Sequence, residues 1–595
     1  MIRRLFRWLI RTVVTVAILI VAAAAIDFYS HQIRRGSFLL VKIDGPVLER
    51  ASVGLLSRVT GRTETPLNVM RKALSDAAKD SRIAGVAVEV LNPDLAFAKA
   101  QEIASMMREV SKSGKPVLAY LETAGEFAPG NLEYLIASSA DSVSLMPQGE
   151  INLVGLQIRE IFARGTLDWL GINPQFEAIG QYKSAPNVFT EKGFTPAQRE
   201  EDTALVESLF NQLVDAVATY RHLSADSVRA LIDRAPLDAK TALSSKLVDR
   251  LEYEDQFLDR IRHYNGKKRK LVNYIDYARP SLLPTLKPVD RIAVIYGSGE
   301  IDRVGGGVDP LGQVGGTLDT RTMSEAFRQV RKDDTIKAVI FRINSPGGSV
   351  IASELIRREV EITARKKPIV VTMSSLGASG AYWVATAANK IFAEPATITG
   401  SIGVLAGKFN IAPAAAKVGV NSEAISRGKN ITLFDEFTDF SAEQQQMLRG
   451  VLLQNIYDEF VTRVAESRKL PVEQVQQIAQ GRVWTGEQAF KLKLVDSLGG
   501  FDAALREAKA EAKIPADHEV ELVELPAQPG FVSQLFGTAE ARALLDQYVF
   551  GKLARLAPML RMQLITPALA GLLYSHAALD AGAHHDGCAS SAMTY

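Results

Sequence analysis

Cysteine is almost absent from this chain of 595 residues, because Cys588 is the only one. A single cysteine excludes an intrachain disulfide and argues against cysteine-based metal or redox chemistry. An excess of charge is also absent, since 69 Lys and Arg residues face 67 Asp and Glu residues. Bulk charge therefore indicates no nucleic-acid partner. The length and the 47% of hydrophobic residues suffice for more than one buried core.

Histidine is missing from a long stretch, because none lies between His263 and His518. A Ser-His-Asp triad or a His-rich metal site built from that stretch is thereby excluded. His584 and His585 stand beside Cys588, as a metal-binding tract would place them. In a terminal, Gly-containing tail we interpret them as a solvated end. We therefore predict that the protein uses no metal and no cofactor.

The N-terminal residues predict export. Residues 1–11 carry four arginines and no acid, and an uncharged apolar run follows over residues 12–26. With residues 8–10 added, the run approaches the roughly 20 residues that span a bilayer. We predict a basic segment and a single transmembrane anchor within residues 1–37, with the arginines kept in the cytoplasm. The alternative is a cleaved signal peptide, for which the small residues 22–25 offer a cleavage site.

The chain repeats itself at a spacing of about 250 residues. Three pairs of segments match in the same order: Phe38-Leu-Leu-Val-Lys-Ile-Asp-Gly45 with Arg291-Ile-Ala-Val-Ile-Tyr-Gly297, Lys115-Pro116 with Lys367-Pro368, and Lys246-Leu-Val-Asp249 with Lys493-Leu-Val-Asp496. We predict two homologous halves, residues 38–275 and 288–510, with a linker over residues 276–287. Residues 511–595 form a tail to which we assign no chemistry.

The pattern of apolar runs predicts an α/β fold. In the second half, residues 292–296, 338–343 and 369–372 are continuous β-type runs, typical of strands buried on both faces of a parallel sheet. Residues 323–332 and 353–366 between them have helical patterns. Strands that alternate with helices form right-handed βαβ units.

A candidate nucleophile follows the last of these strands. Ser379 lies between Ala378 and Gly380, where a helix is expected to begin. Small neighbours allow a sharp backbone turn, and the positive end of a helix favours a developing oxyanion. A serine at this position also suits a simple helix N-cap, which local sequence alone favours.

A glycine pair follows the neighbouring strand, in Asn344-Ser-Pro-Gly-Gly-Ser349. It can turn backbone N–H groups into a pocket, which makes Gly348 and Gly380 the candidate oxyanion hole. A plain strand-to-helix turn is the alternative. Both segments lie at carboxyl ends of consecutive strands, the edge at which α/β sites form.

A serine enzyme without a usable histidine needs another base, and lysine is the known alternative. The amine must be neutral to accept a proton. Its pKa, about 10.4 in water, must then fall by about 2–3 units, which burial in an apolar pocket can supply.

Four motifs carry a resemblance to a known family. They are Asn344-Ser-Pro-Gly-Gly, Ala378-Ser-Gly-Ala-Tyr-Trp383, Thr399-Gly-Ser-Ile-Gly403 and Gly481-Arg-Val-Trp-Thr-Gly486. Their order is that of signal peptide peptidase A, and the doubled architecture resembles its long bacterial form. The resemblance covers about residues 1–510. It implies two tandem ClpP/crotonase-like domains behind a transmembrane helix.

The resemblance also implies an activity, a place and a state of assembly. It implies a serine endopeptidase that degrades leftover signal peptides on the periplasmic side of the bacterial inner membrane. It further implies a homotetramer, with peptides as substrates and no nucleic-acid partner.

Residue roles follow from the same resemblance. Ser379 matches the nucleophile of the family, Lys183 in Gln181-Tyr-Lys-Ser-Ala185 matches its general base, and Ser401 is expected to hold the amine of the lysine. In the duplicated position of the second half, Lys429 is the rival base. It stands close to an arginine and lacks the Tyr-Lys-Ser-Ala context, so we favour Lys183.

The first half has diverged from the second. The duplicate of Ser379 falls near Asn131, and Asn92-Pro93-Asp94 replaces the segment with the glycine pair. The first half is therefore predicted to keep a lysine but no nucleophile. Two alternatives stay open: a crotonase-type acyl-CoA enzyme, against which the export signal stands, and a catalytically inactive membrane scaffold.

Overall fold

The computed structural model describes residues 33–50, 64–279, 289–303 and 318–527. Within these residues no helix has both the length and the hydropathy to cross a bilayer. The run over residues 12–26 and the tail histidines lie outside the described residues, as does most of the linker. The membrane anchor therefore stays a prediction.

The first half is built on a parallel sheet with the strand order β10-β1-β3-β4-β5-β9. Its strands are β1 (Ser37–Leu48), β3 (Ile83–Asp94), β4 (Val117–Leu121), β5 (Ser142–Leu145), β9 (Arg250–Leu251) and β10 (Leu271–Asn273), and β2 (Thr65–Pro66) pairs with β1. Val, Ile and Leu fill both faces of the central strands, as the continuous apolar runs of a parallel sheet require.

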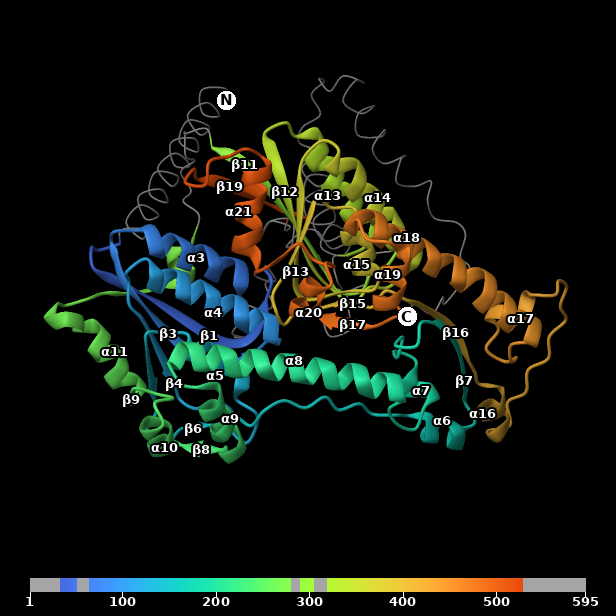
Figure 1. Ribbon diagram of the computed structural model, residues 1–595, viewed down its shortest axis with the longest axis horizontal. Coiled ribbons are helices and arrows are strands. Elements are labelled where there is room, and N and C mark those ends of the chain that lie inside the picture. The colour runs from blue at the N-terminus through green and yellow to red at the C-terminus, as the bar shows by residue number, and fades with distance from the viewer. Residues whose placement is uncertain (1–32, 51–63, 280–288, 304–317, 528–595) are drawn as a thin grey trace, which may run out of the picture. The chain divides into compact units, whose positions relative to one another are not determined.

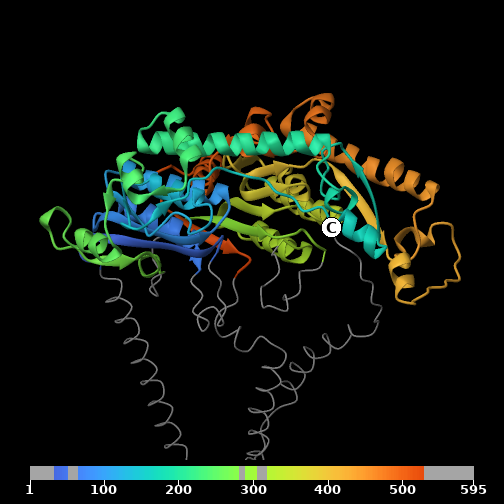
Figure 2. The same cartoon turned by 90° about the horizontal axis from the view of Figure 1, so that it is seen from below.

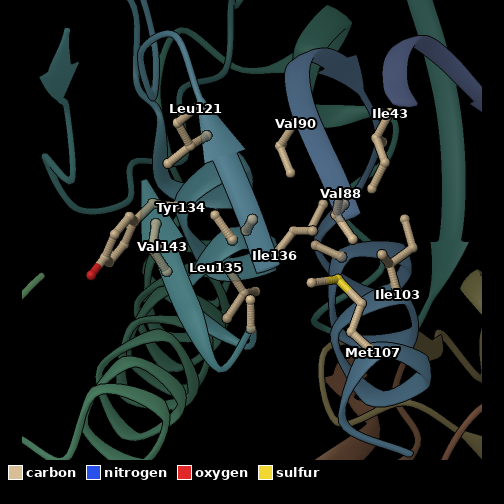
Figure 3. Packing of buried hydrophobic residues seen from close by; sticks show 14 of the residues in the cluster. Ile43, Val88, Val90, Ile103, Met107, Leu121, Tyr134, Leu135, Ile136 and Val143 are labelled. Atoms are coloured by element: carbon tan, nitrogen blue, oxygen red, sulfur yellow. The ribbon is translucent and has the colours of Figure 1, made fainter. Parts of the chain in front are cut away.

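Helices cover both faces of this first sheet. On one face α3 (Leu67–Lys79), α4 (Phe97–Lys112) and α5 (Asn131–Ser138) bury one apolar cluster, and on the other α11 (Glu254–Arg262) buries Phe257 and Ile261. Figure 3 shows the larger cluster, in which side chains of α4 and α5 pack on those of the strands: Ile43, Val88, Val90, Ile103, Met107, Leu121, Tyr134, Leu135, Ile136 and Val143.

The second half repeats this plan. Its sheet has the order β17-β15-β13-β12-β11-β19, and every pair on this path is parallel except β15 with β17. The strands are β11 (Asp290–Ser298), β12 (Ile336–Ser345), β13 (Ile369–Ala378), β14 (Lys390–Ala393), β15 (Ile398–Gly400), β17 (Val483–Thr485), β18 (Ser497–Leu498) and β19 (Val520–Leu525). The helices α13 (Thr320–Lys332) and α14 (Val350–Ala364) lie between strands, as predicted.

The second sheet extends beyond the predicted domain end at residue 510. Strand β19, which lies in the predicted tail, pairs in parallel with β11. It follows α21 (Phe501–Glu511), which covers the sheet with Phe501 and Ala504. The strand was missed because two glutamates interrupt its sequence, Val-Glu-Leu-Val-Glu-Leu, so that it is not a continuous apolar run.

Side-chain contacts confirm the duplication. The hydroxyl of Tyr134 donates to the carbonyl of Leu247, and that of Tyr382 donates to the carbonyl of Leu494, both at 2.7 Å. Each tyrosine is buried on the short helix that follows the third long strand of its sheet. Since 248 residues separate the two tyrosines, the position equivalent to residue 379 is Asn131, as the sequence predicted.

Helix α8 and strand β7 of the first half both contact the second half. The helix α8 (Pro196–Arg221) packs on α5 of the first half and on β17 of the second, and both views show it running along the two halves (Figures 1 and 2). The strand β7 (Asn173–Ile179) pairs antiparallel with β16 (Val404–Asn410). The chain leaves β7 directly toward the predicted base.

The remaining elements are short or peripheral. They are β6 (Glu150–Ile151), α6 (Arg164–Leu170), α7 (Asn187–Thr190), α9 (Ala225–Arg234), β8 (Leu237–Asp238), α10 (Ala239–Ser244), α12 (Tyr274–Tyr277), α15 (Gly380–Ala385), α16 (Ala412–Lys417), α17 (Ala442–Met447), a π-helical stretch (Leu448–Leu453), α18 (Gln454–Arg468), α19 (Val472–Ile478) and α20 (Gly486–Lys491).

Candidate active site

Ser379 lies at the junction between β13 and α15. Its backbone has φ 55° and ψ −121°, a conformation that costs a side-chain-bearing residue about 1–3 kcal/mol and is often found at functional sites. Its side chain makes no capping hydrogen bond to α15. Ser379 therefore occupies the N-cap position without capping the helix through its side chain, and its hydroxyl faces another group instead.

That group is the amine of Lys183. Its Nζ lies 3.2 Å from Ser379 Oγ, 3.0 Å from Ser401 Oγ and 3.4 Å from the Ser401 carbonyl oxygen. The structure thus brings a lysine of the first half to a serine of the second half. The distance is within hydrogen-bond reach, which a general base requires.

Burial lowers the pKa of Lys183 to about 8, and the Glu201 carboxylate acts in the opposite direction. No acidic side chain forms an ion pair with this amine within the described part of the chain. The amine is held instead by neutral oxygens, which leave it able to lose its proton near neutral pH.

Glu201 is a buried carboxyl that acts electrostatically on this amine, and the sequence did not reveal it. It lies on α8, only 2% of its surface is exposed, and the Val483 N–H donates to its Oε1 at 2.6 Å. Burial raises the pKa of this carboxyl to about 7, so the group is partly protonated at neutral pH. A glutamate in an ordinary helical sequence carries no signal of this role.

Ser401 follows β15 and is held in a fixed orientation. Its φ of 51° lies in the left-handed region, and its N–H donates to the Arg482 carbonyl at 2.7 Å. The residue is nearly buried, with 9% of its surface exposed. Its hydroxyl lies 3.0 Å from the amine of Lys183.

The glycine pair lies against the start of α15. A Cβ on Gly347 would come within 2.6 Å of the Gly380 nitrogen, and one on Gly380 within 3.3 Å of the Gly348 nitrogen. A parallel bridge to Ile301 uses the Gly347 carbonyl and the Ser349 N–H, so the N–H of Gly348 points the other way. Among the described residues, no acceptor receives a hydrogen bond from the backbone N–H of Gly348 or of Gly380. Two free donors beside Ser379 suit an oxyanion.

The other candidates lie elsewhere or carry no chemistry. Lys429, the rival base, is exposed within a run of exposed residues. Asn131, which stands where the second half has its serine, is buried and donates from Nδ2 to the Gly155 carbonyl at 2.8 Å. One set of reactive groups therefore forms, from both halves.

Comparison with known proteins agrees with this architecture. The model of Peptidase family S49 matches residues 109–268 and 361–515. Protease 4 of Salmonella typhi is 34% identical over 516 residues, 82% of this chain and 80% of its own. Serine protease SPPA, chloroplastic, of Arabidopsis thaliana is 32% identical over 502 residues, 83% of this chain and 72% of its own.

Two further matches cover parts of the chain. A putative signal peptide peptidase SppA of Enterococcus faecium is 31% identical over 189 residues, 32% of this chain and 55% of its own. A ClpP1 mutant from Listeria monocytogenes aligns with 36% of this chain and 94% of its own, at a TM-score of 0.23 and 14% identity, and carries no weight in the assignment. The family match over both halves and the long relatives together place this chain in peptidase family S49.

Proposed function

We propose that this protein is a membrane-bound serine endopeptidase that uses Ser379 as nucleophile and Lys183 as general base. The single observation that carries the proposal is the 3.2 Å separation between Lys183 Nζ and Ser379 Oγ. Membership of a peptidase family supports peptide bonds as the target. The ClpP/crotonase-like class of the two halves belongs to the same proposal.

The chemistry follows from this geometry. Neutral Lys183 accepts the Oγ proton of Ser379 as Oγ attacks the peptide carbonyl carbon. The N–H groups of Gly348 and Gly380 stabilise the resulting oxyanion. The C–N bond then breaks, Lys183 returns the proton to the leaving amine, and an ester to Ser379 remains.

Water completes the cycle. Lys183 takes a proton from a water molecule as that water attacks the ester carbonyl. Collapse of the second oxyanion releases the carboxylic product and restores the proton to Ser379. Ser401 keeps the amine oriented while the ester forms and while it is hydrolysed, because its hydroxyl is 3.0 Å from Nζ.

The substrate proposed is an extended apolar peptide, in particular the cleaved signal peptides that remain in the bacterial inner membrane. The name of the Enterococcus faecium relative supports this class. The basic and apolar N-terminal sequence supports attachment to that membrane with the body on the periplasmic side.

A homotetramer is part of the same proposal. Large apolar side chains are strongly exposed around β7 and β16, among them Trp169 (76%), Ile425 (103%) and Phe434 (83%). Exposed apolar groups of this kind are typical of surfaces that another protein covers.

The proposal is tested with the purified full-length chain and a fluorogenic apolar peptide. Ser379→Ala and Lys183→Met are expected to lower kcat by about 10³-fold or more, because each removes one half of the pair. The matched control is Lys429→Met, which removes an exposed lysine and is expected to leave hydrolysis unchanged. Hydrolysis by Lys183→Met at the rate of the wild type would contradict the proposal.

A further inference from the structure

The backbone of the segment Gln480-Gly481-Arg482 lies between the backbone that carries Lys183 and the backbone that carries Ser401. Its motif was noted in the sequence, but the mechanism above gives it no role. On one side, the Tyr182 N–H donates to the Gln480 carbonyl at 2.9 Å. On the other side, the Ser401 N–H donates to the Arg482 carbonyl at 2.7 Å. These three residues, called the strap, therefore hydrogen-bond both to Tyr182, the residue before the base, and to Ser401.

The strap also touches the backbone of the base. Gly481 has φ +80°, and a Cβ built on it would lie 2.6 Å from both the nitrogen and the Cβ of Lys183. No side chain fits there without moving the lysine. Glycine is therefore required at this position by close approach as well as by conformation.

The side chain of Arg482 secures the residue next to the base. Its guanidinium lies 4.7 Å from the centre of the Tyr182 ring and 4.4 Å from that of Trp484. Its Nη1 donates to Glu200 Oε1 at 2.7 Å, and the hydroxyl of Tyr182 donates to Glu200 Oε2 at 2.9 Å. The ring and the hydroxyl of Tyr182 are thus both held by the same ion pair.

From these contacts we propose that Arg482 is a positioning residue for the general base of the peptidase. It acts through Tyr182 and fixes the loop that carries Lys183, so that Nζ stays within reach of Ser379. The inference rests on the proposed function, since it assigns a role in the reaction of that same pair. A displacement of about 1 Å at reacting groups costs on the order of 10²-fold in rate.

The groups around the amine predict a second effect of losing Arg482, on the pH dependence of hydrolysis. The groups that face it are the hydroxyls of Ser379 and Ser401 and the carboxyl of Glu201 from α8. If the loop of Lys183 loosens, water reaches the amine and favours its charged form. Loss of Arg482 should therefore raise the pH at which the enzyme becomes active.

The test uses the full-length chain with Arg482→Ala, Arg482→Lys and Glu200→Gln, and measures kcat, KM and the pH profile of kcat. For Arg482→Ala we expect kcat to fall about 10–100-fold with KM within about twofold, and the acidic limb to move up by about half a unit or more. Arg482→Lys should recover part of kcat, because it keeps a cation between the rings and one donor for Glu200. Glu200→Gln should show the same changes at smaller size.

Glu200→Gln tests the same contacts in a variant that is expected to fold. Glu200 is 58% exposed on its helix, and glutamine has nearly the same size and shape. A matched control is Arg321→Ala, which breaks an exposed ion pair with Glu325 on α13 and should leave kcat and the pH limb unchanged. If wild-type hydrolysis depends on Lys183 while both Arg482→Ala and Glu200→Gln keep its kcat and its limb, the inference is wrong and the proposed function stands. If wild type shows no Lys183-dependent hydrolysis, the proposed function itself fails.

Discussion

At Lys183, a positively charged side chain stands where burial disfavours its charge. Its pKa of about 8 means that a sizeable share of the amine is neutral near physiological pH. The energetic cost of losing water is offset by hydrogen bonds from and to neutral groups rather than by an ion pair. A share of the amine is therefore neutral near physiological pH, and a neutral amine can accept a proton.

A pH dependence follows from this value. Only the neutral amine can accept the proton of Ser379, and the neutral fraction grows as pH rises through about 8. The value of kcat/KM for peptide hydrolysis should therefore rise tenfold per pH unit below about 8 and level off above it. A profile that is flat between about pH 6 and 9, or that falls as pH rises through 8, would contradict a neutral lysine base.

Replacement of Glu201 should shift this profile in the direction opposite to loss of Arg482. The Glu201 carboxylate raises the pKa of Lys183, and its Oε1 accepts from the Val483 N–H, which an amide oxygen can also do. In Glu201→Gln the acidic limb of kcat/KM should move to lower pH. A limb that stays in place, measured with the same peptide, would show that Glu201 does not act on the amine.

Residue roles were only partly predictable from sequence. Ser379, Lys183 and Ser401 lie in recognisable motifs, and the structure brings their side chains together. Arg482 also lies in a recognisable motif, but the motif does not show its contact with Tyr182. Glu201 lies in no such motif, and both placements depend on where α8 and the segment leading into β17 pass each other. Contacts of this kind arise where distant segments cross, which local sequence does not show.

Among the elements, the duplicated helix α5 and its counterpart α15 show what the halves still share. Each contributes a buried tyrosine whose hydroxyl satisfies a leucine carbonyl at the end of the same half. The start of the helix has changed instead, from a buried asparagine in one half to a strained serine in the other. The two halves thus keep the tyrosine contact and differ at the residue where this helix starts.

The two tyrosines should contribute equally to stability. Tyr134→Phe and Tyr382→Phe each leave a buried carbonyl without its donor, which costs about 1–3 kcal/mol. Chemical denaturation should give similar losses in the free energy of unfolding for both variants. The control is Tyr253→Phe, whose hydroxyl bonds Gln148 at an exposed site and should cost little. A loss for one buried tyrosine and none for the other would contradict the equivalence of the halves.

The alternation of helices and strands in the second half was predictable, because β11, β12 and β13 contain continuous apolar runs. These strands are longer than predicted, since polar residues at their carboxyl ends, such as Ser345 and Ser374, are buried in the sheet rather than placed in loops. The pairing of β7 with β16 was not predictable, because it joins segments more than 200 residues apart whose sequences show no strong alternation.

Across the whole molecule, a buried charge network joins the two halves. Arg342 of β12 is 2% exposed and donates to Glu49 at 2.9 Å and also to Glu102, both of the first half. Burial alone would raise the pKa of Glu49, but the charges of Arg342 and Lys99 hold it down at about 2. The network ties together the halves that must share one active site.

Removal of the central cation should therefore be costly. Arg342→Met removes the cation that pairs with buried Glu102 and leaves Glu49 with Lys99 alone. Breaking such a buried pair costs about 3–5 kcal/mol. Thermal unfolding should show a clear fall in Tm, together with reduced hydrolysis because Lys183 and Ser379 come from different halves. In Arg321→Ala, which breaks an exposed pair with Glu325, the cost should stay below about 1 kcal/mol. Equal stability of the two variants would contradict a role for the network in joining the halves.

The central claim is that an amine from one repeat activates an alcohol from the other. The most direct measurement is the rate at which a fluorophosphonate forms an adduct with the full-length chain, with the modified residue identified by mass spectrometry. The account predicts an adduct on Ser379 in the wild type, formed about 10²-fold or more slowly in Lys183→Met. An adduct on another residue, or equal rates for the two proteins, would contradict it.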